Sequence, residues 1–239
     1  MFYKNGITAA AILLCASAAC AQSAGSVLVT AGWLHLAPQT ASDPLRVTSV
    51  GGTPTNIVRT GTHTNVESAD TVGLGINYFI TDNIVGEVFA GVPPRHTITG
   101  TGTLQKYGEL GNVKQWSPAL LVKYYFGSAT QRFRPYVGAG VNYTWFTNGQ
   151  LTNSQFAKDN YGPGSSTDVK ADASWNPVFT LGASYAITDR WYAGAFVSYL
   201  PLQTTAKLTT TTATKTVVTS EANIKIRPIV TYLSVGYRF

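Results

Sequence analysis

The chain has 239 residues, of which 44% are hydrophobic and only 12% are charged, and its formal net charge is +6. The basic residues are scattered and form no block, which argues against a nucleic-acid-binding surface. Both cysteines, Cys15 and Cys20, lie near the start, so the rest of the chain offers neither a disulfide nor a thiolate metal site.

Residues 1–21 have the features of a secretory signal peptide. Lys4 supplies the positive start, residues 6–14 form an apolar core too short to span a bilayer as a helix, and Ala19-Cys20-Ala21 fits the cleavage pattern. Lipidation of Cys20 is the alternative, disfavoured because Ser17 stands where a large aliphatic residue is usual. We therefore expect a single mature domain over residues 22–239.

Two-residue alternation and turn signals predict eight strands in the mature chain. Their expected ranges are 27–37, 69–80, 84–99, 113–126, 133–147, 168–187, 191–204 and 217–239. Short turns (81–83, 127–132, 188–190) alternate with long, polar connections (38–68, 100–112, 148–167, 205–216). This alternation predicts an all-β fold, an eight-stranded antiparallel transmembrane β-barrel of the outer membrane, with long loops outside and both termini periplasmic.

Aromatic residues gather at the two ends of the predicted strands, where interfacial girdles of a barrel lie. The group near the turns and the C-terminus comprises Tyr124, Phe126, Tyr136, Tyr185, Trp191, Tyr237 and Phe239. The group near the long loops comprises Trp33, Trp116, Trp145 and Trp175. Ordinary core aromatics are the alternative interpretation.

Alternation also assigns side chains to the lumen. Few charges point inward, chiefly Glu87, Arg95, Lys123 and Arg238. An isolated charge in a narrow interior is costly, so Glu87 and Lys123 on neighbouring strands are predicted to form an ion pair with a structural role.

Several apolar residues also point inward on the loop side, whereas a water-filled pore is lined with polar groups. They are Leu34, Leu36, Phe89, Leu121, Phe196, Leu200 and Leu202. An apolar lumen indicates a dry plug, a binding path for apolar molecules, or simple packing. Prolines within the predicted strands (Pro93, Pro94, Pro118, Pro135, Pro177, Pro201, Pro228) either weaken the wall or mark where strands bend.

Five stretches resemble the OmpW family of small outer-membrane proteins. They are Val92-Pro93-Pro94-Arg95-His96, the run from Ser117-Pro118 to Gly127, the block 133–144, Asp172-Ala173-Ser174-Trp175 and the closing Gly236-Tyr237-Arg238-Phe239. The resemblance extends from about Val29 to the end, and its most specific part is Arg134 to Thr144.

The resemblance implies a narrow hydrophobic channel for small hydrophobic compounds, with release sideways through the wall. The prolines within the predicted strands suggest that such an exit lies near Pro93, Pro118 or Pro177. It implies that Trp175 gates the channel, whereas alternation with Phe179 places Trp175 toward lipid. It also implies that the barrel-assembly machinery recognises Tyr237 and Phe239. The expected partners are therefore outer-membrane lipids, this machinery and small hydrophobic solutes.

Two other functions are compatible with a small outer-membrane barrel. A barrel enzyme needs a serine within reach of a histidine, and His35, His63 and His96 show no such spacing, so we expect neither an enzyme nor a cofactor or metal site. The second is a surface-binding, adhesion or phage- or bacteriocin-receptor barrel that acts through its loops. A polar, filled lumen would favour adhesion, and an apolar, continuous lumen would favour transport.

Overall fold

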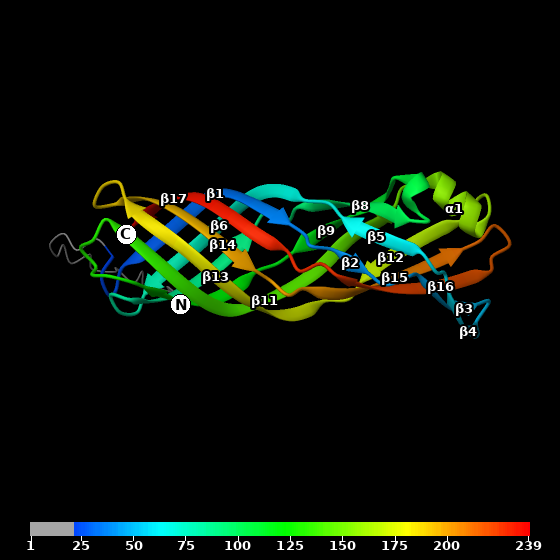
Figure 1. Ribbon diagram of the computed structural model, residues 1–239, viewed down its shortest axis with the longest axis horizontal. Helices are drawn as coiled ribbons and strands as arrows, with labels where there is room; N and C mark the ends of the chain where they lie inside the picture. The colour runs from blue at the N-terminus through cyan, green and yellow to red at the C-terminus, as the bar shows by residue number, and fades with distance from the viewer. Residues whose placement is uncertain (1–21) are drawn as a thin grey trace, which may run out of the picture.

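The computed structural model describes residues 22–239, so the expected signal peptide lies outside the described residues. Antiparallel strands form an elongated cylinder (Figure 1). Leu28 pairs with Arg238, so the two ends of the described chain meet at one end of the cylinder, called here the terminal end. Helix α1 (Ser154–Tyr161) lies at the other, the loop end (Figure 1). Within residues 22–239 no helix is long and apolar enough to cross a bilayer.

Eight strands close the half of the cylinder at the terminal end into a ring. Each pairs with the next, and the last pairs with the first, so that the ring has no open edge. In ring order they are β1 (Val27–Ala37), β6 (Ala69–Phe79), β7 (Ile84–Gly91), β10 (Ala119–Tyr125), β11 (Phe133–Leu151), β13 (Ser174–Ala186), β14 (Trp191–Tyr199) and β17 (Ile229–Arg238). The predicted eight-stranded antiparallel barrel is confirmed.

Side chains occupy most of the narrow interior of this ring. Along β10, buried Ala119, Leu121, Lys123 and Tyr125 alternate with exposed Leu120, Val122 and Tyr124, as the alternation predicted. Glycines make room for inward aromatic rings. A Cβ on Gly182, for example, would lie 2.5 Å from Cζ of Tyr136, so only glycine admits that ring.

Further strands extend the wall toward the loop end, and they come from parts of the expected loops and from the outer ends of the predicted strands (Figure 1). Segments such as 203–211 and 217–225 favour this because they are rich in β-branched residues, which suit strands. The added elements are β2 (Ala41–Ser42), β3 (Arg46–Val50), β4 (Thr53–Val58), β5 (Thr62–Val66), β8 (Arg95–Gly102), β9 (Glu109–Trp116), β12 (Ser166–Ala171), β15 (Gln203–Thr211), β16 (Val217–Lys225) and the short helix η1 (Gln105–Tyr107).

Five of the seven prolines predicted to lie within strands mark the junction between the two halves. Breaks at Pro93-Pro94, Pro118, Pro201 and Pro228 separate β7 from β8, β9 from β10, β14 from β15 and β16 from β17. Pro135 and Pro177 remain inside β11 and β13. The alternative that prolines mark bends is thus correct for the first set, because proline cannot donate to the ladder.

The outer surface of the ring is a belt of large apolar side chains. Two aromatic groups border it, as expected of a membrane-spanning barrel: Tyr124, Phe126, Tyr185, Trp191, Tyr237 and Phe239 at the terminal end, and Trp33, Trp116 and Trp175 toward the loop end. The Trp116 and Trp145 rings stack with centroids 5.6 Å apart. Tyr136 does not belong to the group at the terminal end, because it is buried in the lumen, on the inward face that alternation along its strand assigns to it.

Candidate binding path in the barrel interior

An apolar cavity lies in the loop-side half of the cylinder and is called here the upper cavity. It encloses about 130 Å³ and is bounded by β5, β8, β9, β11, β12, β15, β16 and α1. Apolar side chains dominate its wall, among them Val66, Ile98, Phe146, Leu208 and Ile224. The wall is therefore suited to an apolar molecule and poorly suited to ions.

A second space, the lower cavity, lies inside the ring and encloses about 70 Å³. Gln115 lines both cavities, so they adjoin at this residue. Six predicted lining residues surround the lower cavity: Leu34, Leu36, Phe89, Leu121, Phe196 and Leu200. Leu202 is fully buried but lines neither cavity.

Below the lower cavity the lumen is filled by a group called here the floor, made of Glu87, Lys123, Tyr125 and Tyr136. The expected ion pair is present: Lys123 Nζ lies 2.7 Å from Glu87 Oε1, and each side chain is only 3% exposed. Lys123 also donates to Asn77 and lies 4.7 Å from the centroid of the Tyr136 ring. The charges are thus compensated within the lumen, as burial requires.

Arg134 closes the terminal end below the floor, and sequence reasoning did not single it out. Its guanidinium donates to the backbone carbonyl oxygens of Phe126, Asp82 and Gln22, and its side chain is 0% exposed. Gln22 in turn donates to Ser184 Oγ at 2.9 Å. Gln22, the first described residue, therefore fills the terminal end of the interior of the ring. Alternation along β11 places Arg134 on the same inward face as Tyr136, so this pattern in the sequence could have identified Arg134 as a residue of the lumen.

Two predicted lumen residues face outward instead. Trp175 is 71% exposed, and its ring contacts Tyr143 on the outside with centroids 4.8 Å apart. Its assignment to the channel lining is wrong, and the alternation with Phe179 was the better guide. Arg95 is exposed and donates to Asn112, because the break at Pro93-Pro94 reverses the inward parity between β7 and β8. The residue that turns inward there is His96.

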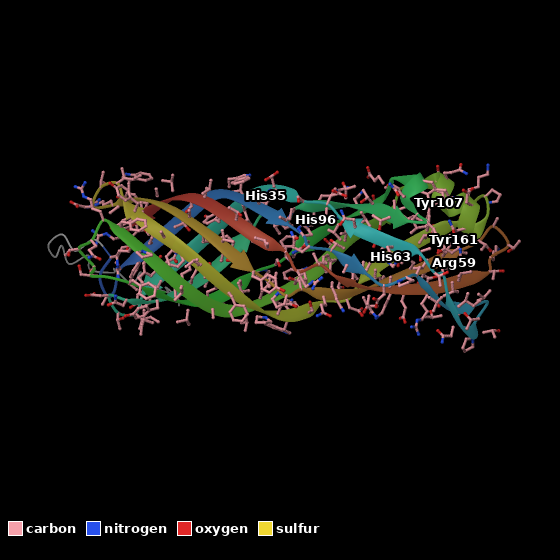
Figure 2. All side chains as sticks on the ribbon, viewed as in Figure 1. His35, Arg59, His63, His96, Tyr107 and Tyr161 are labelled. Atoms are coloured by element: carbon pink, nitrogen blue, oxygen red, sulfur yellow. The ribbon has the colours of Figure 1, made fainter. Side chains whose placement is uncertain are left out.

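The loop end of the cylinder carries a small cap built on η1 and α1. Leu104, Leu110, Phe156 and Tyr161 form a separate apolar cluster, and the first three also bound the upper cavity. Figure 2 shows Tyr107, Tyr161 and Arg59 together at this end, where Arg59 donates to Asn160 of α1 at 2.8 Å. The cap therefore covers the outer side of the upper cavity.

The three histidines occupy different environments. His35 lies on the outer surface with Trp33 and makes a 2.8 Å contact with Asp70. His63 and His96 line the upper cavity, and each directs Nδ1 to a backbone carbonyl, of Ser42 and Glu67 respectively. In the described structure none of them bonds a serine hydroxyl, and no group of three or more His, Cys, Asp or Glu there could hold a metal.

Comparison with known proteins gives one consistent result. The model of the OmpW family matches residues 23–239. Outer membrane protein W of Vibrio cholerae serotype O1 is 33% identical over 243 residues, covering 99% of this chain and 100% of that protein. The crystal structure of outer membrane protein OprG from Pseudomonas aeruginosa superposes with a TM-score of 0.79 at 27% identity, over 91% of this chain and 97% of that one. The dibenzothiophene metabolism operon protein DoxH of Pseudomonas sp. strain C18 is 26% identical over 68% of each chain.

Proposed function

Because this chain belongs to the OmpW family and is a barrel of the outer membrane, we propose that it is a passive conduit for small hydrophobic molecules. The observation that carries the proposal is the pair of adjoining apolar cavities above a filled floor. The name of the relative DoxH also refers to the metabolism of dibenzothiophene, a small apolar aromatic. No side chain here needs to perform chemistry, because diffusion down a gradient supplies the driving force.

The filled floor directs the path sideways. The ladder between β13 and β14 ends at Phe179 and Tyr199, although β13 itself continues to Ser174. The wall resumes only where Ala171 of β12 pairs with Ala206 of β15. Val178 and Leu200 border this gap in pairing and both line the lower cavity. Release into the membrane between β13 and the segment 200–202, beside Pro177, is therefore the proposed exit.

Uptake measurements test the conduit. Vesicles that carry the wild-type barrel should take up naphthalene faster than vesicles without it. Leu121→Asp, Phe196→Asp should abolish the gain, because two carboxylates in the lower cavity repel an apolar solute and attract water. Ala119→Trp should also slow uptake by filling the same space without adding charge. The matched control is Thr209→Asp, Thr211→Asp, which adds two carboxylates on β15 near the loop end.

Equal uptake by wild-type and barrel-free vesicles would overturn the conduit and favour the loops as a binding surface. Folding of each variant is checked by its heat-dependent mobility in detergent gels. A variant that inserts at the wild-type level and still conducts naphthalene would remove the lower cavity from the path.

A cross-link tests the lateral exit. The mature chain has no cysteine, so Pro177→Cys, Pro201→Cys introduces two unique thiols at the edges of the gap. A bifunctional thiol reagent should then slow naphthalene uptake. The same reagent on Val197→Cys, Thr231→Cys joins strands that are already paired and should change nothing. Unchanged uptake after complete cross-linking of the first pair would place the exit elsewhere.

A further inference from the structure

The upper cavity contains one deeply buried polar atom that has no partner. His96 of β8 lines this cavity and is 1% exposed, and its Nε2 makes no hydrogen bond within the described structure. Figure 2 places His96 near the middle of the cylinder. The side chain of Gln115, which lines both cavities, contacts His96. Buried polar groups are usually satisfied, so this atom points to a ligand.

The hydrogen-bonding role of Nε2 follows from the contact made by the other nitrogen of the His96 imidazole, Nδ1. Nδ1 lies 2.9 Å from the backbone carbonyl oxygen of Glu67, and since a carbonyl only accepts, Nδ1 carries the hydrogen. Burial lowers the pKa of His96 from its ordinary 6.5, so the imidazole is neutral at pH 7. In this tautomer Nε2 is a hydrogen-bond acceptor with a free lone pair.

The surroundings give the acceptor its selectivity. Val66, Ile98, Ile224 and Ile226 bound the same cavity and offer no side-chain donor. The Gln115 side chain contacts His96. Its amide nitrogen donates to Ser117 Oγ at 3.4 Å, and by distance and angle Nε2 of His96 makes no hydrogen bond. An apolar molecule that brings its own donor satisfies the nitrogen, whereas a pure hydrocarbon leaves it unpaired at a cost.

The geometry points to a binding site in the upper cavity for small apolar molecules that carry one hydroxyl group, such as alcohols or phenols, with the hydroxyl donating to His96 Nε2. This inference rests on the proposed conduit, because the site lies on its entry side. Thr64, whose buried Oγ1 also has no partner, lines the same cavity and pairs in the ladder with Gly100, nearer the loop end. Thr64 therefore provides a second polar contact between the loop end and His96.

Three ligands of similar shape test the site: naphthalene, 2-naphthol and 2-methoxynaphthalene. Their binding to the barrel in lipid nanodiscs at pH 7 is measured by equilibrium dialysis, and partition into empty nanodiscs is subtracted. We expect 2-naphthol to bind roughly five- to tenfold more tightly than 2-methoxynaphthalene, which has similar bulk and no donor, the factor that one added hydrogen bond supplies.

His96→Phe should abolish this preference while naphthalene still binds. His35→Phe makes the same change on the outer surface and should keep the preference. Should His96→Phe fail to insert, ¹⁵N labelling of the wild-type histidines replaces it, because Nε2 of His96 should shift with 2-naphthol and not with 2-methoxynaphthalene. Equal binding of 2-naphthol and 2-methoxynaphthalene would overturn the site and leave the conduit standing. Absence of naphthalene binding and uptake would instead overturn the conduit.

Discussion

At the scale of single residues, the lumen separates into a polar floor and an apolar upper part. Glu87 and Lys123 face each other because β7 and β10 are neighbours and both residues have inward parity. Such a pair is stable only as a unit, since the removal of one partner leaves an uncompensated buried charge.

Lys123→Met is therefore expected to cost about 3–5 kcal/mol of stability, the range for breaking a buried ion pair. The double change Glu87→Leu, Lys123→Met should cost clearly less, because no charge remains. Urea unfolding in lipid vesicles, followed by tryptophan fluorescence, measures both. A double variant as unstable as the single one would show that the shape of the floor matters more than its charge.

Arg134 provides a second prediction at this scale. Arg134→Leu removes every hydrogen bond that holds Gln22 to the guanidinium, so hydrogen exchange over residues 22–26 should accelerate. Arg132→Leu is the matched control, because Arg132 is exposed in the same turn and should leave the exchange unchanged. Equal exchange in both variants would mean that Gln22 is held by Ser184 instead.

At the scale of elements, the cap depends on one side chain. Asn153 accepts from the backbone N–H of Phe156 at the start of α1, and its amide donates to the carbonyl oxygens of Tyr107 and Glu109. It thus joins α1 to η1 over the upper cavity. β11 runs without a break from the ring to Leu151, shortly before Asn153, so it connects the cap to the ring.

Asn153→Ala should destabilise α1 by about 1 kcal/mol, the usual cost of losing an N-cap. Hydrogen exchange should rise over residues 154–161 and stay unchanged in β10. Asn56→Ala removes an exposed asparagine from β4, outside the helix, and serves as the control. Faster exchange throughout the barrel would show that the cap and the ring unfold together.

At the scale of the whole molecule, the filled floor distinguishes this barrel from an aqueous pore. Tyr125 and Tyr136 pack with centroids 4.7 Å apart below the ion pair, and Arg134 closes the end beneath them. Eight strands leave an interior that side chains can fill, so steady ion flow has no continuous water path.

Planar bilayers that contain the wild-type barrel should therefore show little steady ion conductance. Tyr125→Ala, Tyr136→Ala should raise conductance by opening the floor. Tyr124→Ala removes an outward ring from the same strand and should leave conductance at the wild-type level. A large wild-type conductance would contradict a sealed floor.

The sequence by itself determined the ring. The start and end of β1 follow from alternation, as does the inward orientation of Phe89, Leu121 and Phe196, because a closed barrel forces each strand to be apolar outside with a fixed period of two. The ion pair of Glu87 and Lys123 follows from the same period together with strand order. The role of Tyr237 and Phe239 in assembly stays a prediction.

Only the tertiary structure decided what happens at the junction. A break between two strands can shift the inward and outward positions by one residue. Beyond Pro93-Pro94, Arg95 therefore faces outward and His96 inward, which alternation along a single unbroken strand cannot predict. The long connections became wall because their strands pair with segments that are distant in sequence, as β3 does with β16 and β12 with β15. The buried acceptor of His96 likewise exists only because β8 turns it into a cavity whose other walls come from seven other elements.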